Sequence, residues 1–176
     1  MENLKGIFES ANISGKNYTF VSTEDLENGM LVHMGDLVTG SKDIYNAVIP
    51  ATATLASSPV YVIGNPAWSY DDGSKTNQNE NAYVIKAGTP FRVYALNKND
   101  KFAIADYGID GGEAEVGKYV GLQNGSGKPT LSATKPTGSA FVGEIVYVRR
   151  LGAEYFVGQT VDTRVNKVVI KVVSNG

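Results

Sequence analysis

The segment GLQNGSGKPT, residues 121–130, gives the strongest hint of chemistry in this chain. Its Gly127 and Lys128 are arranged like the end of a phosphate-binding loop, which requires Gly, four residues, Gly-Lys and then Ser or Thr. Leu122 occupies the position of the first glycine, and Pro129 the position of the hydroxyl residue. Proline also lacks the backbone N–H that such a loop uses. We therefore predict no nucleotide site here, but a tight hairpin turn at the preceding Asn-Gly dipeptide.

His33 is the only histidine, and it lies in an alternating run beside Gly35. A triad with one of the serines would need a context such as G-x-S-x-G, and the chain has no such motif. We interpret His33 as a structural or surface residue of a strand.

Acidic side chains gather in DYGIDGGEAE, where oxygen ligands at short spacing suit calcium. The spacing of Asp106, Asp110, Glu113 and Glu115 does not match an EF-hand, so we interpret them as solvated turns. The chain has no cysteine, which excludes thiol catalysis and cysteine-ligated zinc. The sequence therefore predicts no catalytic, cofactor-binding or metal-binding residue, and we expect a protein that is not an enzyme.

Two aromatic residues, Trp68 and Tyr70, stand in NPAWSYD beside the long polar stretch 69–82. Aromatic residues on surface loops often anchor a partner. They also often cap one end of a β core. Both interpretations stay open, and Trp68 and Tyr70 are the candidate partner-contact residues.

Charge and hydropathy limit the classes of partner. The formal net charge is −2 and the basic residues are scattered, whereas a protein that binds duplex nucleic acid usually carries a basic face. No stretch approaches the roughly 20 apolar residues of a membrane span. The start of the chain lacks the apolar run of a signal peptide. We expect synthesis in the cytoplasm and neither a nucleic-acid nor a membrane partner.

The composition predicts an all-β fold. Valine, threonine and ten tyrosines favour strands, and twenty glycines punctuate short alternating runs. Residues 167–173 alternate with one buried face, and residues 141–150 are apolar on both faces, as in a central strand. Further strands are expected at 18–21, 30–33, 60–63, 83–85, 90–96, 101–105, 119–122 and 155–157.

Helix signals are weak, and we expect at most about two helical turns at 22–29 and a single helical turn at 111–118. Residues 1–20 have little periodicity and are interpreted as an extended N-terminal arm. Residues 21–176 then form one compact β domain, a barrel or a sandwich, with a subdivision near the 69–82 loop as an alternative.

The segments LENGMLVHMGDLVTG and YNAVIPATATLASSPVYVIGNPAWSYD resemble auxiliary head proteins of tailed bacteriophages. In the C-terminal part, KFAIADYGIDGGEAEVGKYVGLQNGSGKPTLSA followed by FVGEIVYVRR is similar to the small β-barrels of phage decoration, or cement, proteins. The resemblance spans residues 22–176.

The resemblance implies a structural protein of the virion that binds the outer capsid surface and stabilises contacts between major capsid subunits. It also implies a homo-oligomer, commonly a trimer, with the major capsid protein as partner and no cofactor. The alternative is a carbohydrate- or cell-surface-binding β module of a phage fibre or tail, with Trp68 and Tyr70 in its contact surface. A small hydrolase that uses His33 or the acidic turns is the third hypothesis.

Overall fold

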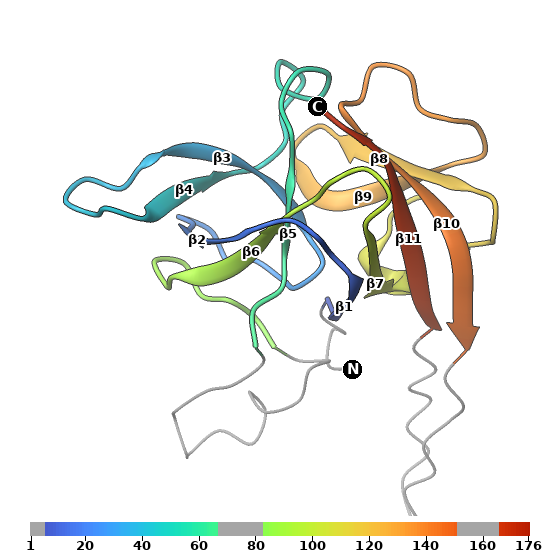
Figure 1. Ribbon diagram of the computed structural model, residues 1–176, viewed down its shortest axis with the longest axis horizontal. Coiled ribbons are helices and arrows are strands. Elements are labelled where there is room, and N and C mark those ends of the chain that lie inside the picture. Colours follow the sequence, from blue (N-terminus) through green and yellow to red (C-terminus); the bar gives the residue numbers. More distant parts are fainter. Residues whose placement is uncertain (1–5, 67–82, 151–165) are drawn as a thin grey trace, which may run out of the picture.

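The computed structural model describes residues 6–66, 83–150 and 166–176, and it confirms the predicted all-β fold (Figure 1). Helix in the described ranges is limited to the 3-10 turn η3 (Asp106–Gly108). The strands are β1 (Phe8–Asn12), β2 (Asn17–Val21), β3 (Leu31–Leu37), β4 (Ile44–Val48), β5 (Tyr61–Ile63), β6 (Phe91–Ala95), β7 (Lys101–Ala105), β8 (Tyr119–Gln123), β9 (Ser126–Ser132), β10 (Phe141–Arg150) and β11 (Asn166–Asn175).

Five strands close into a barrel with the order β2-β4-β3-β5-β6. Strand β2 is parallel to β4 and antiparallel to β6, and the β2–β6 pairing closes the ring. Alternate side chains point inward along each strand, so Phe20, Val32, Ile63, Phe91 and Val93 fill the interior.

The other strands form a six-stranded sheet with the order β1-β7-β11-β10-β8-β9. Its centre is the long antiparallel pair β10–β11, whose register shifts twice. On β11 the buried side chains are Val168, Ile170 and Val172, which confirms the alternation predicted for residues 167–173.

Besides the barrel interior, a second apolar core lies between the barrel and the sheet. Leu31 and Val62 point out of the barrel and pack with Phe102, Phe141 and Ile170 of the sheet, and all five are fully buried. Neighbouring residues on β3 and β5 point into the barrel, so both faces of these strands are buried. Consecutive apolar residues on β3 and β5 therefore pack alternately into the barrel interior and against the six-stranded sheet.

The predicted N-terminal arm over residues 1–20 is wrong from residue 8 onward. Phe8–Asn12 pairs with β7 in the six-stranded sheet, and Asn17–Val21 pairs with β4 and β6 in the barrel. The arm interpretation missed β1 because FESAN has no β-branched residue, and tertiary pairing overrides such weak propensity.

The chain changes from barrel to sheet between β6 and β7, rather than at the 69–82 loop. Strands β5 and β6, on either side of that loop, are direct antiparallel neighbours in the barrel. The connection at 96–100 is fixed by buried Asp100, whose carboxylate accepts hydrogen bonds from the Ser14 hydroxyl at 2.7 Å and from the Asn97 backbone N–H at 2.8 Å.

Two other expectations also need correction. Residues 22–29 and 111–118 form turns without helix, and within 83–85 only Ile85 forms a bridge, with Leu26. The strands β4 and β9 were not predicted. The expectation for residues 155–157 lies outside the described residues.

Candidate functional site

The predicted partner-contact residues, Trp68 and Tyr70, lie outside the residues that the structure describes. Their role therefore stays a prediction. The described residues contain two other features with the character of a binding surface. These features are a pocket beside β1 and a group of tyrosines at one end of the barrel.

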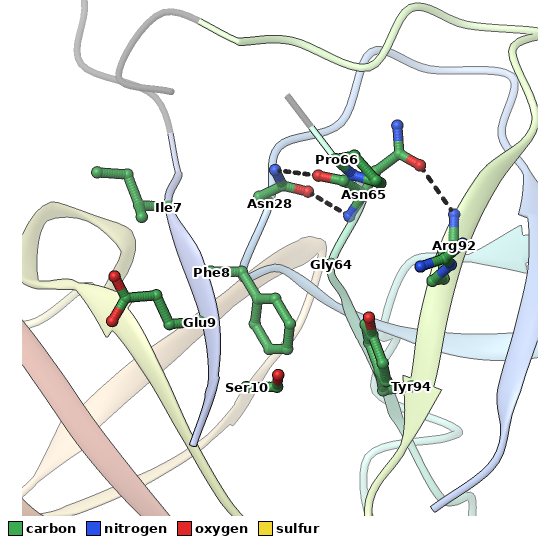
Figure 2. Close-up of a pocket in the computed structure, with 10 residues that line it drawn as sticks. All are labelled: Ile7, Phe8, Glu9, Ser10, Asn28, Gly64, Asn65, Pro66, Arg92 and Tyr94. Carbon is green, nitrogen blue, oxygen red and sulfur yellow. Dashed lines mark hydrogen bonds between the residues drawn. The ribbon is translucent and has the colours of Figure 1, made fainter. Parts of the chain in front are cut away.

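The pocket has a volume of about 520 Å³ and lies between the edge strand β1 and the barrel strands β5 and β6 (Figure 2). Residues 7–10 form one wall, and residues 64–66 with Arg92 and Tyr94 form the other. Ligand sites commonly occur at such junctions between structural units.

An aromatic stack closes the bottom of the pocket. The rings of Phe8 and Tyr94 stack with centroids 5.3 Å apart at an angle of 28°, and Phe8 also contacts Phe102 in the sheet core. Gly64 makes this approach possible, because a Cβ at this position would come within 2.4 Å of the Phe8 ring. Phe8 therefore joins the sheet to the barrel at the floor of the pocket.

A pair of asparagines fixes the wall at residues 64–66. The side chain of Asn28 donates to the backbone oxygen of Asn65 at 2.9 Å and accepts from its backbone N–H at 2.9 Å. The Asn65 side-chain oxygen accepts from the Arg92 backbone N–H at 3.2 Å, and its amide donates to the Tyr83 hydroxyl at 2.6 Å. These bonds, drawn in part in Figure 2, hold the wall without using the Arg92 side chain.

The Arg92 guanidinium is the one unneutralised charge among the described residues that line the pocket. It is exposed and has no ion-pair or hydrogen-bond partner in the described part of the chain. The other charged lining residue, Glu9, is paired with Lys167 on β11. Arg92 therefore gives the lining of this pocket one positive charge that no described residue neutralises.

The second feature is the tyrosine end of the barrel, formed by Tyr18, Tyr45 and Tyr61. These residues lie near the starts of β2, β4 and β5, which run in the same direction, so their rings meet at one end. The Tyr18 ring lies 5.5 Å from that of Tyr61 and 6.3 Å from that of Tyr45. Leu37, which is 43% exposed, is in register with Tyr45 at this end.

The three tyrosines are half-buried, and their hydroxyls have no hydrogen-bond partner within the described residues. The pKa of Tyr61 is raised above its ordinary value of 10.0, first by burial and then by the nearby Tyr18 and Tyr45 phenols. An apolar body with a free polar tip is the arrangement that makes tyrosine common in protein interfaces. The sequence shows many tyrosines but not the strand order that brings these three together.

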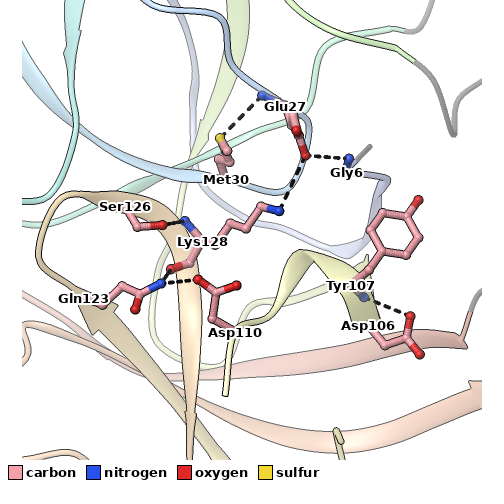
Figure 3. A network of polar contacts seen from close by, with 9 residues as sticks. All are labelled: Gly6, Glu27, Met30, Asp106, Tyr107, Asp110, Gln123, Ser126 and Lys128. Atoms are coloured by element: carbon pink, nitrogen blue, oxygen red, sulfur yellow. Dashed lines mark hydrogen bonds and ion pairs between the residues drawn. The ribbon is translucent and has the colours of Figure 1, made fainter. Parts of the chain in front are cut away.

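Lys128, the lysine of the apparent phosphate loop, makes a structural contact with Glu27 (Figure 3). Gly125 adopts φ +74° in the turn between β8 and β9, which confirms the predicted hairpin. Lys128 on β9 points toward the barrel, where its Nζ lies 4.0 Å from Oε2 of Glu27. That carboxylate also accepts the Gly6 backbone N–H at 3.1 Å.

His33 is buried at 3% exposure, with its Nδ1 3.0 Å from the Pro59 backbone oxygen. Its Nε2 has no hydrogen-bond partner within the described residues. The prediction of a structural histidine agrees with this position, because the ring contacts a backbone carbonyl in the interior.

Three of the four acidic residues in the 106–115 region make separate contacts. Asp106 accepts from the Asn166 amide at 2.8 Å, Asp110 from the Gln123 amide, and Glu115 pairs with Lys118 at 3.3 Å. Within the described ranges, no three acidic, histidine or cysteine side chains lie together as a metal site would require.

No protein-family model, no curated protein and no solved structure matches this chain. None of the helical segments in the described part has the length and apolar character needed to cross a membrane. The fold defines an all-β protein in which a closed five-stranded barrel packs against a six-stranded sheet.

Proposed function

We propose that this chain is a non-enzymatic structural protein of a phage virion. In this role it binds the outer surface of the capsid and stabilises contacts between the major capsid subunits. The proposal begins from the resemblance to phage decoration proteins, whose segments fall in both halves of the fold. Residues 26–40 lead into and form β3, and residues 101–133 run from β7 to β9.

The observation that carries the proposal is the tyrosine end of the barrel. Tyr18, Tyr45 and Tyr61 offer aromatic surface and hydroxyls without a partner among the described residues, and Leu37 adds an exposed aliphatic side chain beside them. A stable interface buries about 1,600 Å² in total and is enriched in tyrosine. Contacts repeated over a capsid add avidity, so a modest interface in each copy is sufficient.

A rigid body supports the same role. Buried apolar contacts join the outer face of the barrel to the sheet, so a load on one half is transmitted to the other. A rigid body of this kind can bind neighbouring capsid subunits and resist their separation. The resemblance further suggests a symmetric oligomer, commonly a trimer, and light scattering on the purified chain would measure its mass.

Capsid binding is the direct test. The chain would be mixed with particles that lack it, sedimented, and quantified for the wild type and for Leu37→Glu. We expect Leu37→Glu to lower occupancy about tenfold or more, because a charge is buried at the interface. Val116→Glu is the control, since Val116 is 63% exposed and lies outside the tyrosine end.

Equal occupancy of the two variants would overturn the assigned contact surface. Virions purified without any trace of the chain would overturn the capsid role itself. Removal of residues 1–20 is unsuitable as a test, because it would delete all of β1 and most of β2 from the two sheets.

A carbohydrate-binding module of a phage fibre or tail is the second candidate. The tyrosine end favours it as well, because aromatic rings with free hydroxyls suit the apolar face and the hydroxyl groups of a sugar. A glycan array probed with the wild type and with Tyr18→Ala would test it. Binding to a defined glycan that Tyr18→Ala abolishes would favour this role over the capsid role.

A further inference from the structure

We infer that the pocket beside β1 accepts an extended, acidic segment of a partner protein, which adds as a strand to the free edge of β1. The inference stands on the geometry of the pocket and goes beyond the proposed capsid role. In this arrangement β1 is the edge strand with which the partner segment pairs.

Strand β1 has one edge with which no described strand pairs. Among the described strands it pairs only with β7, and it forms the end of the six-stranded sheet. Its residues from Glu9 onward are exposed. An edge strand presents unpaired N–H and C=O groups to which another extended chain can bind.

The pocket runs along this edge. Four consecutive residues, from Ile7 to Ser10, line it. Successive side chains of a strand point to opposite faces, and Figure 2 shows Phe8 and Ser10 on the side opposite to Ile7 and Glu9. Because residues from both faces of β1 line the pocket, we infer that the pocket also borders the backbone edge of β1, which lies between these faces.

The volume and shape suit a peptide. At about 520 Å³ the pocket is within the usual range of ligand sites. Its floor, the Phe8–Tyr94 stack, offers an apolar contact for one side chain of the added strand. The bonds between Asn28 and Asn65 hold the opposite wall in place before any ligand binds, which lowers the entropic cost of binding.

The charge selects an acidic segment. Arg92 lines this pocket and its guanidinium has no partner among the described residues, whereas the Glu9 carboxylate pairs with Lys167. A guanidinium matches the two oxygens of a carboxylate with paired hydrogen bonds. We therefore expect an Asp or Glu side chain of the bound strand to lie against Arg92.

The test uses the full chain and a yeast-displayed library of short random peptides. We expect selected peptides to carry Asp or Glu at one fixed position and to lack proline in the paired region. The best peptide would then be synthesised and its Kd measured by fluorescence anisotropy. Arg92→Gln is expected to weaken binding about tenfold or more, because a charged hydrogen bond is lost.

Arg149→Gln is the matched control, because Arg149 is an exposed arginine on β10 outside the pocket. It should bind the peptide as the wild type does. Methylation of single backbone nitrogens in the peptide should weaken binding at alternate positions, as strand pairing requires. Amide exchange in residues 8–12 should slow when the peptide binds.

Three outcomes would overturn the inference. The first is a library that yields no binder, and the second is a binder with equal affinity for the wild type and Arg92→Gln. The third is self-association of the chain that Arg92→Gln abolishes, which would make a second copy the occupant. Peptide binding is measured without capsids, so a failed capsid experiment and a failed peptide experiment are distinguishable.

Discussion

Glu27 and Lys128 face each other across the junction between the barrel and the six-stranded sheet, with 4.0 Å between Oε2 and Nζ. Both side chains are largely shielded, at 16% and 28% exposure. Their attraction is therefore screened less by water than that of a surface pair. The lysine that resembled a phosphate ligand in the sequence thus helps to hold the two halves of the fold together.

Replacing this lysine should cost stability. We expect Lys128→Met to lower the free energy of unfolding by about 1 kcal/mol, because methionine keeps the apolar stem and leaves Glu27 without this cation. Urea denaturation followed by Trp68 and tyrosine fluorescence would measure the change. Lys86→Met is the control, because the Lys86–Asp25 pair is 72% and 48% exposed and should contribute less than about 0.5 kcal/mol. Equal losses of unfolding free energy in the two variants would show that the Glu27–Lys128 pair stabilises the fold no more than an exposed ion pair does.

Gly64 should tolerate no side chain. A Cβ there would lie 2.4 Å from Phe8 Cε1 and 2.6 Å from Tyr94 Cε2, so Gly64→Ala must displace the aromatic stack. We expect a loss of about 1–3 kcal/mol in the free energy of unfolding. Gly108→Ala is the matched control, since no atom lies within 4 Å of its added Cβ, and it should stay within about 0.5 kcal/mol of the wild type. A stable Gly64→Ala variant with an unchanged Phe8 environment by NMR would contradict the packing described for this floor.

The sequence predicted most of the strands because their signal is local. Strand β11 alternates strictly, and β10 is apolar on both faces, so each could be assigned from its own residues. Strand β9 was missed because Pro129 argues against a strand. Proline is accepted there because β9 is the edge strand of its sheet, where one side needs no ladder hydrogen bond.

The candidate sites could not be predicted in the same way, because they depend on which strands are neighbours. Tyr18, Tyr45 and Tyr61 are far apart in the chain and meet only when the barrel closes. Phe8 and Arg92 line one pocket only because β1 joins the six-stranded sheet while β6 stays in the barrel. Alternation identifies a strand and its buried face, but it contains no information about strand order.

His33 should carry a proton on Nδ1. That nitrogen lies 3.0 Å from the Pro59 carbonyl oxygen, which can only accept a hydrogen bond, so Nδ1 must be the donor. Two-bond ¹⁵N–¹H correlation spectra of the imidazole would identify the protonated nitrogen. His33→Ala should lower the free energy of unfolding by about 2 kcal/mol or more, because it removes this bond and leaves a cavity in the interior. An unprotonated Nδ1 would contradict the contact with Pro59.

Tyr61 should make stability fall in alkaline solution. Its pKa is raised above the ordinary value of 10.0, mainly by burial and further by Tyr18 and Tyr45. Above about pH 10 the unfolded chain therefore releases this proton before the folded chain does, so the free energy of unfolding decreases as the pH rises through that window.

The substitution Tyr61→Phe removes this ionisable proton. We expect the stability of the variant relative to the wild type to be constant below about pH 9 and to increase between about pH 10 and 11. Urea denaturation at a series of pH values would measure the difference, and phenolate absorbance would report the ionisation directly. Parallel stability curves for the two proteins over the whole range would mean that the Tyr61 hydroxyl is as well hydrated in the folded barrel as in the unfolded chain.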